Sequence, residues 1–406
     1  MPGEKRSHQR TVGAAVTIAA GALASYGACA LPAFQKHLQS YLAIDDRAYG
    51  FLFSTWGLGT AATALVAGVL VDRKGPVRIL RGALLGLGLA MLLMAASGRL
   101  WLLLAGGLGV MALFQTFFST AANVYLVRAF PGRPRRMLSL NLAVTSGVAV
   151  ILPALAAALL NVSQRMPQVS FGLILHAPFG LIACALLLAR FLYRREPLAA
   201  AAPPQAFGWR DLMLPRPTLA LVLLTSVHAV ADSTLYVWMP RYLGSAAFPS
   251  CPIAPGLVLS ACSLAYLVSR SAMVLVPEHR GRRAFLVAPG MLGGAALLAG
   301  ILSRSFFVTV AGYVLGSLIW SAEYPAILGA IADQDSRRFG TASAVVSFVT
   351  AIGTFLMLNG VGLLVGGLGE VQMWKALLIP AAGFPLFSLG ATLWLAAHRD
   401  GIPRGE

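Results

Sequence analysis

The sequence has little charge. Only 11% of its 406 residues are Asp, Glu, Lys or Arg, and 58% are hydrophobic, whereas roughly a quarter of an ordinary soluble domain is charged. A chain with so few charged side chains cannot cover a globular surface with polar groups. We therefore expect lipid rather than water to surround most of it.

The sequence also has few of the residues from which catalytic and nucleotide sites are built. Its four cysteines show no CxxC pair and no metal-ligand spacing. The glycine-rich segments 86–88 and 106–109 resemble pieces of nucleotide loops, but they lie inside apolar runs, where close helix packing explains them. No Walker sequence, catalytic triad, zinc set or haem ligand pair is present. We therefore expect no metal, no cofactor, no enzymatic activity and no ATP-driven transport.

Long apolar runs are what the sequence does have. About 20 apolar residues cross a bilayer as a helix, and this length predicts an all-α membrane protein with twelve transmembrane helices. The run behind the N-terminus is too long for a secretory signal and begins a series of spans, so we expect it to be retained. The spans are expected near 11–33, 48–71, 79–98, 100–127, 137–161, 171–193, 217–243, 256–277, 284–303, 306–332, 341–368 and 373–397.

The formal net charge of +17 could suggest a nucleic-acid partner, but the basic residues lie mostly in alternate short loops. Cytoplasmic loops are enriched in Lys and Arg, so this pattern predicts that both termini are cytoplasmic. We expect a multi-pass protein of the cell (inner) membrane and no nucleic-acid partner. The other side of the membrane is expected to hold only Lys36, Arg47, Arg99, Arg165, Arg241, Arg304 and Lys375, and Arg270 lies within a span.

The chain divides into two halves that share a loop pattern. Residues 1–193 and 217–406 are each expected to form a six-helix bundle, joined by a cytoplasmic linker at 194–216. An acid, a turn glycine and several bases follow the second span, and a similar loop follows the eighth. In each loop the acid can meet free N–H groups at a neighbouring helix N-terminus. The residues of this pattern are Gly68, Asp72, Arg73, Gly75, Arg78, Glu278 and Gly281.

The first of these loops resembles the signature G-x-x-x-D-R-x-G-x-x-R of the major facilitator superfamily. The resemblance, together with twelve spans and a central linker, covers essentially the whole chain. It implies two six-helix bundles, a solute site near mid-membrane and alternating access by rocking of one bundle on the other. It also implies a monomer. In addition, it implies that the two loops act as a conformational latch, which stabilises an arrangement closed on the cytoplasmic side.

Closer resemblances point in two directions. Segments 238–243, 324–327 and 338–343 resemble fucose:proton symporter-type members, yet the acids that those members carry in spans one and four are absent here. A lone basic residue in span eight resembles that of monocarboxylate and oxalate:formate carriers, in which it binds carboxylate. The matching position is Arg270.

Three ionisable residues fall inside spans, and all of them lie in the second half: Asp232, Arg270 and Glu323. A charge at the bilayer centre costs about 2.5 kcal/mol or more unless it is paired or hydrated, and such residues usually face a cavity. We hypothesise that Arg270 pairs with Glu323 in one state and moves toward substrate or Asp232 in another. The alternative is a fixed ion pair that only orders the bundle.

His228 lies one helical turn before Asp232 in span seven, so both side chains project from one face. An imidazole beside a carboxylate can hold or pass a proton near neutral pH. His228, Asp232 and Glu323 are therefore the candidates for proton coupling. The alternative for His228 is a packed, hydrogen-bonded histidine between helices.

Aromatic and polar residues at similar depth complete the candidate site, because aromatic walls commonly line sugar and organic-anion cavities. The alternative for each is ordinary helix packing or interhelical hydrogen bonding. The second half supplies Tyr236, Tyr266, Trp320 and Tyr324, and the first half supplies Tyr26, Gln115 and Asn141.

These observations favour a secondary active transporter that moves a small polar solute, either an organic anion or a sugar, with proton coupling. The same pattern allows proton-driven efflux of amphipathic compounds. A third interpretation is a membrane receptor or scaffold that does not transport. The expected partners are a small-molecule substrate, protons and the lipid bilayer.

Overall fold

The structure, a computed structural model, describes residues 2–130, 133–165, 170–192, 214–276, 282–334 and 339–397. These residues are almost entirely helical and contain no strand. The first half contains α1 (Pro2–Ala24), α2 (Tyr26–Ala30), the 3-10 turn η1 (Leu31–Phe34), α3 (Gln35–Leu42), α4 (Asp46–Lys74), α5 (Pro76–Ala95), α6 (Trp101–Ala129), α7 (Pro134–Arg165) and α8 (Phe171–Leu192). The second half contains α9 (Arg216–Leu243), α10 (Pro255–Leu275), α11 (Arg282–Ser303), α12 (Phe306–Trp320), α13 (Glu323–Gln334), α14 (Phe339–Leu368), the 3-10 turn η3 (Glu370–Gln372) and α15 (Met373–Ala397).

The predicted spans are confirmed by the helix lengths. In the described part of the chain, 11 helical segments are long and apolar enough to cross a membrane. The remaining apolar helix, Thr11–Ala24, is shorter, because the first span is interrupted at Ser25. Most of the expected linker lies outside the described residues, and α9 begins at Arg216.

Two of the predicted spans contain a break in the helix. The first span breaks at Ser25, whose hydroxyl donates to the Gly21 carbonyl at 2.9 Å. The tenth span breaks at residues 321–322, between α12 and α13. Pro325 follows that break in the first turn of α13, and proline has no N–H with which to continue the preceding turn.

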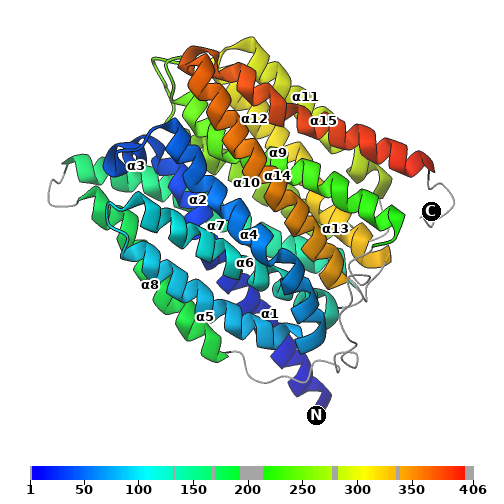
Figure 1. The fold of residues 1–406 in the computed structure, drawn as a ribbon. Coiled ribbons are helices and arrows are strands. Elements are labelled where there is room, and N and C mark those ends of the chain that lie inside the picture. Colours follow the sequence, from blue (N-terminus) through cyan, green and yellow to red (C-terminus); the bar gives the residue numbers. More distant parts are fainter. Residues whose placement is uncertain are drawn as a thin grey trace.

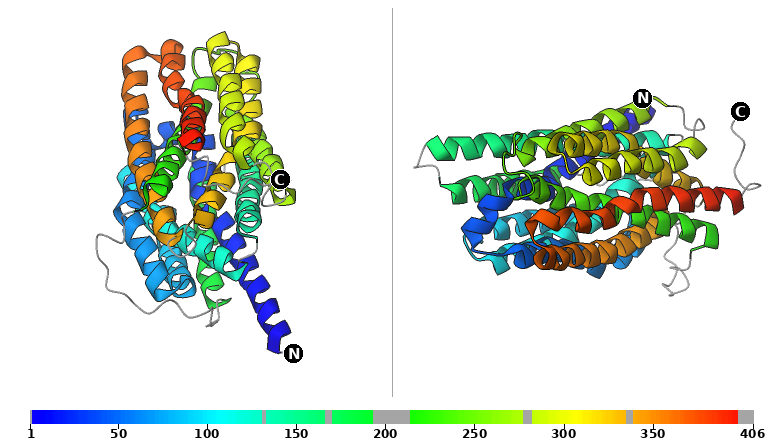
Figure 2. Two further views of the ribbon diagram at one scale, coloured as in Figure 1. Left: turned by 90° about the vertical axis from the view of Figure 1, so that its right-hand side faces the viewer. Right: turned by 90° about the horizontal axis from the view of Figure 1, so that it is seen from above.

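The two halves of the chain lie side by side (Figure 1). The helices run along one common direction in the right-hand view of Figure 2. Within the first half α4 packs on α6 and α5 packs on α8, and within the second half α9 packs on α15 and α11 packs on α12. The halves meet where α4 contacts α14 and where α7 contacts α10.

The outward faces of these helices are apolar. Leu181 of α8 is 74% exposed, and Leu363 of α14 is 63% exposed. Lipid tails solvate such side chains, whereas water does not. The exposed leucines therefore support the membrane environment that the composition predicts.

The first half depends on a close approach between α4 and α6. A Cβ atom added at Gly59 of α4 would collide with the carbonyl oxygen of Gly109 on α6. Small residues let helix backbones approach in this way, so van der Waals packing can hold helices together within lipid. Gly106 lies on the same helix as Gly109, and a Cβ added there would meet nothing within 4 Å.

We expect Gly59→Ala to destabilise the protein by about 1–3 kcal/mol, because the added methyl group has to push backbone atoms apart. Gly106→Ala is the matched control and is expected to be neutral or slightly stabilising, since it adds a helix-favouring residue in open space. Thermal unfolding of the purified protein in detergent measures both. Equal unfolding temperatures for the two variants would contradict the packing argument.

Candidate functional site

A cavity of about 470 Å³ lies between the two halves, within the usual size range of small-molecule sites. Residues from both halves form its walls, so a movement of one half against the other would reshape it. The first half contributes Cys29 of α2, Phe53, Trp56, Gly57 and Thr60 of α4, Leu108 of α6, and Thr145, Ser146 and Ala149 of α7. The second half contributes Asp232, Ser233, Tyr236 and Val237 of α9, Ser263, Tyr266 and Arg270 of α10, Tyr324 of α13, and Val346, Ser347, Thr350, Ala351, Thr354 and Leu358 of α14.

A hydrogen-bonded chain leads from this cavity into the second half. The hydroxyl of Tyr266 donates to Asp232, and the indole Nε1 of Trp320 donates to the same hydroxyl at 3.0 Å. Trp320 is fully buried and stacks on Phe384, with the ring centroids 3.9 Å apart. Trp320 thus fixes Tyr266, and Tyr266 in turn orients the Asp232 carboxylate.

Arg270 of α10 lies beside this chain and reaches across to the first half. Its Nη1 donates to the hydroxyl of Ser146 on α7 at 2.7 Å, and its guanidinium lies 4.7 Å from the centre of the Tyr266 ring. Its Nε is buried without a hydrogen-bond partner. A guanidinium has five N–H donors, so Arg270 retains donors that these contacts do not use.

Glu323 pairs with His228 rather than with Arg270. One carboxylate oxygen of Glu323 lies 2.8 Å from His228 Nδ1, and the other accepts the backbone N–H of Gly290 on α11. Both side chains are almost completely buried. The hypothesised Arg270–Glu323 pair is therefore not formed here, because the helix break before Glu323 directs its side chain toward α9 and α11.

Five of the sequence-predicted site residues line the cavity: Asp232, Tyr236, Tyr266, Arg270 and Tyr324. Trp320, Glu323 and His228 lie behind its wall. Although His228 and Asp232 share α9, they bond to different partners, Glu323 and Tyr266. The predicted pair is thus split between two hydrogen-bonded groups in this structure.

The three candidates from the first half do not line the cavity. Tyr26 packs edge-on against Phe179, with ring centroids 5.2 Å apart. Asn141 faces α1, where its side-chain oxygen lies 4.0 Å from a Cβ built on Gly21. On α6 the cavity is lined by Leu108, and Gln115 lies two turns further along that helix. Their role in substrate binding therefore stays a prediction.

Sequence reasoning missed the polar residues of α14. Ser347, Thr350 and Thr354 line the cavity at spacings of three and four residues, which place them on one helix face. The sequence contains this spacing. Because these residues lie within one of the most hydrophobic spans, the search for charged and aromatic residues did not single them out.

Asp72, in the last turn of α4, makes side-chain contacts with both halves of the molecule. Asp72 accepts a hydrogen bond from Arg128 Nη2 at 3.0 Å within the first half, and one from Thr341 Oγ1 at 3.3 Å at the start of α14. Gly75 ends α4 with φ of +81°, a conformation that strains residues with a side chain. Glu278 and Gly281 of the second copy lie outside the described residues.

The remaining candidate latch residues differ in their surroundings. Gly68 is buried within α4, Arg73 is partly exposed, and Arg78 is exposed on α5. A second contact between the halves lies at this end, where Arg135 Nη2 of α7 donates to the carbonyl of Val276 at 2.8 Å. The Asp72 end of the molecule is therefore joined across the halves at two places.

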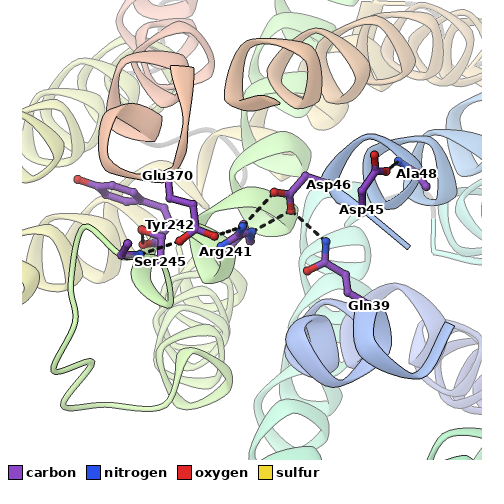
Figure 3. Close-up of polar contacts among 9 residues, drawn as sticks. Gln39, Asp45, Asp46, Ala48, Arg241, Tyr242, Ser245 and Glu370 are labelled. Carbon is purple, nitrogen blue, oxygen red and sulfur yellow. Dashed lines mark hydrogen bonds and ion pairs between the residues drawn. The ribbon is translucent and has the colours of Figure 1, made fainter. Parts of the chain in front are cut away.

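The opposite end, where α4 begins at Asp46, is joined by an ion-pair network (Figure 3). Arg241, near the end of α9, donates to both carboxylate oxygens of Asp46 at 2.9 Å and also to Glu370 of η3. Gln39 of α3 donates to Asp46 at 2.9 Å. The Arg241 side chain is only 8% exposed, so this network closes the two halves together at the Asp46 end.

A family comparison agrees with this architecture. The family model of the Major Facilitator Superfamily matches residues 15–357. The chain belongs to the major facilitator superfamily. Comparison with curated proteins gives no match.

Two solved structures show the superfamily fold. The chain resembles the fucose:proton symporter FucP of E. coli with a TM-score of 0.71 and 17% identity, over 95% of this chain and 98% of that one. A structure of the FucP transporter in its outward conformation gives a TM-score of 0.70 and 18% identity, over 95% and 99% of the two chains. These likenesses confirm the predicted fold class, and membership of the superfamily makes this chain a multi-pass membrane protein built for secondary transport.

We expect Arg241→Gln to expose the cavity from the Asp46 end. The neutral amide cannot replace the two charge-assisted hydrogen bonds that the guanidinium donates to Asp46 across the halves. Cys29 lines the cavity and reports on it in a variant that carries Cys184→Ser, Cys251→Ser and Cys262→Ser. A membrane-impermeant maleimide is expected to label Cys29 several-fold faster when Arg241 is changed.

Arg47→Gln is the matched control for this measurement. Arg47 lies next to Asp46 on the same turn of α4, is exposed, and forms no ion pair with the described residues. We expect its labelling rate to equal that of the parent. Equal rates in the Arg241 and Arg47 variants would show that the network does not restrict entry.

Proposed function

We propose that this protein is a proton-coupled carrier of a small carboxylate-bearing solute and that it works by alternating access. The observation that carries the proposal is that one acid and one base, Asp232 and Arg270, both line a cavity between the halves. An intramembrane ionisable residue that faces a cavity is a functional candidate by default. Here the two charges share one connecting residue, Tyr266.

Arg270 is the proposed anchor for the solute. Arginine binds carboxylates through two parallel N–H donors, which gives both geometry and strength. The hydrogen bond to Ser146 uses one nitrogen of the guanidinium, and the buried Nε has no partner. A carboxylate on Arg270 would therefore bind next to a contact between the halves, where it could influence their movement.

Charge balance in the cavity supports the proposal that a proton moves together with the solute. The cavity holds one carboxylate and one guanidinium, so an arriving anion adds a net negative charge in a region of low dielectric constant, which is costly. A proton on Asp232 removes that charge. Solute anion and proton would then cross together without net charge transfer.

The buried His228–Glu323 pair is the proposed second proton site. Glu323 begins α13 directly after the break that follows Trp320, and Tyr324 next to it lines the cavity. A change of protonation at Glu323 would therefore act on a segment that lines the cavity through Tyr324. Histidine can exchange protons near neutral pH, which suits a partner of this carboxylate.

The contacts at the two ends support alternating access. The Asp46 network and the Asp72 latch each join the two halves, and opening one end requires its own contacts to break. In this proposal the Asp46 end faces outward and the termini face the cytoplasm, as the distribution of basic residues predicts. The two halves act as six-helix bundles within a monomer.

The alternative of proton-driven efflux remains a prediction of the sequence. The aromatic lining, which includes Phe53 and Trp56, would suit amphipathic compounds. The direction of solute movement under an imposed pH gradient separates uptake from efflux. Absence of any solute-dependent flux would support the scaffold alternative.

We expect Arg270→Lys to lower carboxylate counterflow in proteoliposomes by about tenfold or more, because an ammonium lacks the two-pronged geometry of the guanidinium. Arg304→Lys, at an exposed position outside the cavity, is the control and is expected to transport like the parent. Undiminished counterflow in the Arg270 variant would remove the guanidinium from the mechanism.

We expect Asp232→Asn to abolish accumulation driven by a pH gradient and to retain counterflow, because the amide does not ionise near neutral pH but still lines the cavity. Asp45→Asn is the matched control, since asparagine caps a helix as well as aspartate and Asp45 caps α4 outside the cavity. Persistent accumulation in the Asp232 variant would locate proton coupling elsewhere.

A further inference from the structure

Two threonines of α14 differ from most other helical hydroxyl residues of this chain. Thr225 and Thr234 of α9 donate to carbonyls of their own helix at 2.6 and 2.7 Å, and Thr145 of α7 does so at 3.0 Å. Thr350 and Thr354 line the cavity, and their buried hydroxyls have no hydrogen-bond partner in the part of the chain that the structure describes. Leaving a buried hydroxyl unpaired is costly, so a role in binding would explain it.

The geometry of α14 brings these two hydroxyls together. Thr350 and Thr354 are four residues apart, so their side chains lie on the same helix face, one turn apart. Ser347 extends the same cavity-lining stripe by another turn. Its hydroxyl is already bonded to the Ser343 carbonyl at 3.0 Å. The two threonines are therefore the members of the stripe whose hydroxyls are left to bind a ligand.

Arg270 of α10 lines the same cavity and also has an unused N–H donor. The cavity thus combines one fixed positive charge with a pair of hydroxyls that both donate and accept hydrogen bonds. A simple monocarboxylate would satisfy the arginine and leave the threonines unpaired. A neutral sugar would satisfy the threonines but would offer the guanidinium no carboxylate to accept its unused N–H donors.

We propose that the transported solute is a polyhydroxylated carboxylate, that is, a sugar acid. Its carboxylate binds Arg270, and its hydroxyls bind Thr350 and Thr354. This inference rests on the proposed carrier function and specifies its substrate class. The aromatic wall, to which Trp56 and Tyr236 belong, provides the apolar surface against which the C–H face of a sugar packs.

The experiment is a counterflow panel in proteoliposomes with D-gluconate, D-glucuronate, hexanoate and D-glucose as probes. Hexanoate has the same number of carbon atoms as gluconate and lacks the hydroxyls, whereas glucose has the hydroxyls and lacks the carboxylate. We expect at least one of the two sugar acids to exchange at least about tenfold faster than hexanoate and glucose. A site that hydrogen-bonds a substrate hydroxyl discriminates strongly against analogues without it.

Threonine variants test whether the preference for sugar acids over hexanoate comes from the hydroxyls of Thr350 and Thr354. In the double variant Thr350→Val, Thr354→Val we expect the ratio of sugar-acid to hexanoate exchange to fall toward one, because valine keeps the shape and removes the hydroxyl. Thr225→Val removes a satisfied hydroxyl outside the cavity and is expected to leave the ratio unchanged. Thr350→Ser, Thr354→Ser keeps both hydroxyls and is expected to retain most of the preference, which separates hydrogen bonding from packing.

The possible failures are distinguishable. If the carrier exchanges hexanoate as fast as both sugar acids, the sugar-acid inference is wrong and the carboxylate carrier proposal stands. If it exchanges glucose but neither acid, both are wrong. If the folded parent protein exchanges none of the four probes, the sugar-acid inference is wrong, and a wider set of labelled carboxylates then tests the carrier proposal. An unchanged preference in the valine variant would exclude the threonines as its source.

Discussion

A charge inside an apolar helical bundle has to be partnered, and this constraint governs the second half of the protein. Glu323 is held by His228 and a backbone N–H, and Asp232 is held by Tyr266. Arg270 is held less completely, by one serine and an aromatic ring. Because its Nε has no acceptor among the described residues, it is the charge best placed to receive a ligand.

Helices α4 and α14 connect the cavity to both ends of the molecule. At one end Asp46 of α4 enters the Arg241 network, and at the other Asp72 of α4 contacts Thr341 of α14. Both helices also line the cavity between these ends. A tilt of α4 against α14 would therefore strain one set of end contacts, relieve the other and change the cavity shape in a single movement.

The positions of most spans could be predicted from the sequence because apolar length alone sets them. The Asp46–Arg241–Glu370 network could not, since its members are separated by 195 and 129 residues and lie at span ends, where charges are common. Tyr26, Gln115 and Asn141 do not line the described cavity for a similar reason. Polarity and depth were known for each, but the face that each helix turns toward the cavity depends on its neighbours.

The broken tenth span shows how a local backbone rule produces the site. Pro325 is tolerated in the first turn of a helix but interrupts the turn before it, so α13 starts afresh at Glu323. An acid at a helix N-terminus is favoured by the helix dipole, which helps to offset the cost of burying Glu323. On one side of this break Trp320 donates a hydrogen bond to Tyr266. On the other side Tyr324 lines the cavity. One interruption thus sets the buried acid and the cavity wall beside each other, and in the proposed mechanism a proton taken up at Glu323 would act on the cavity wall through Tyr324.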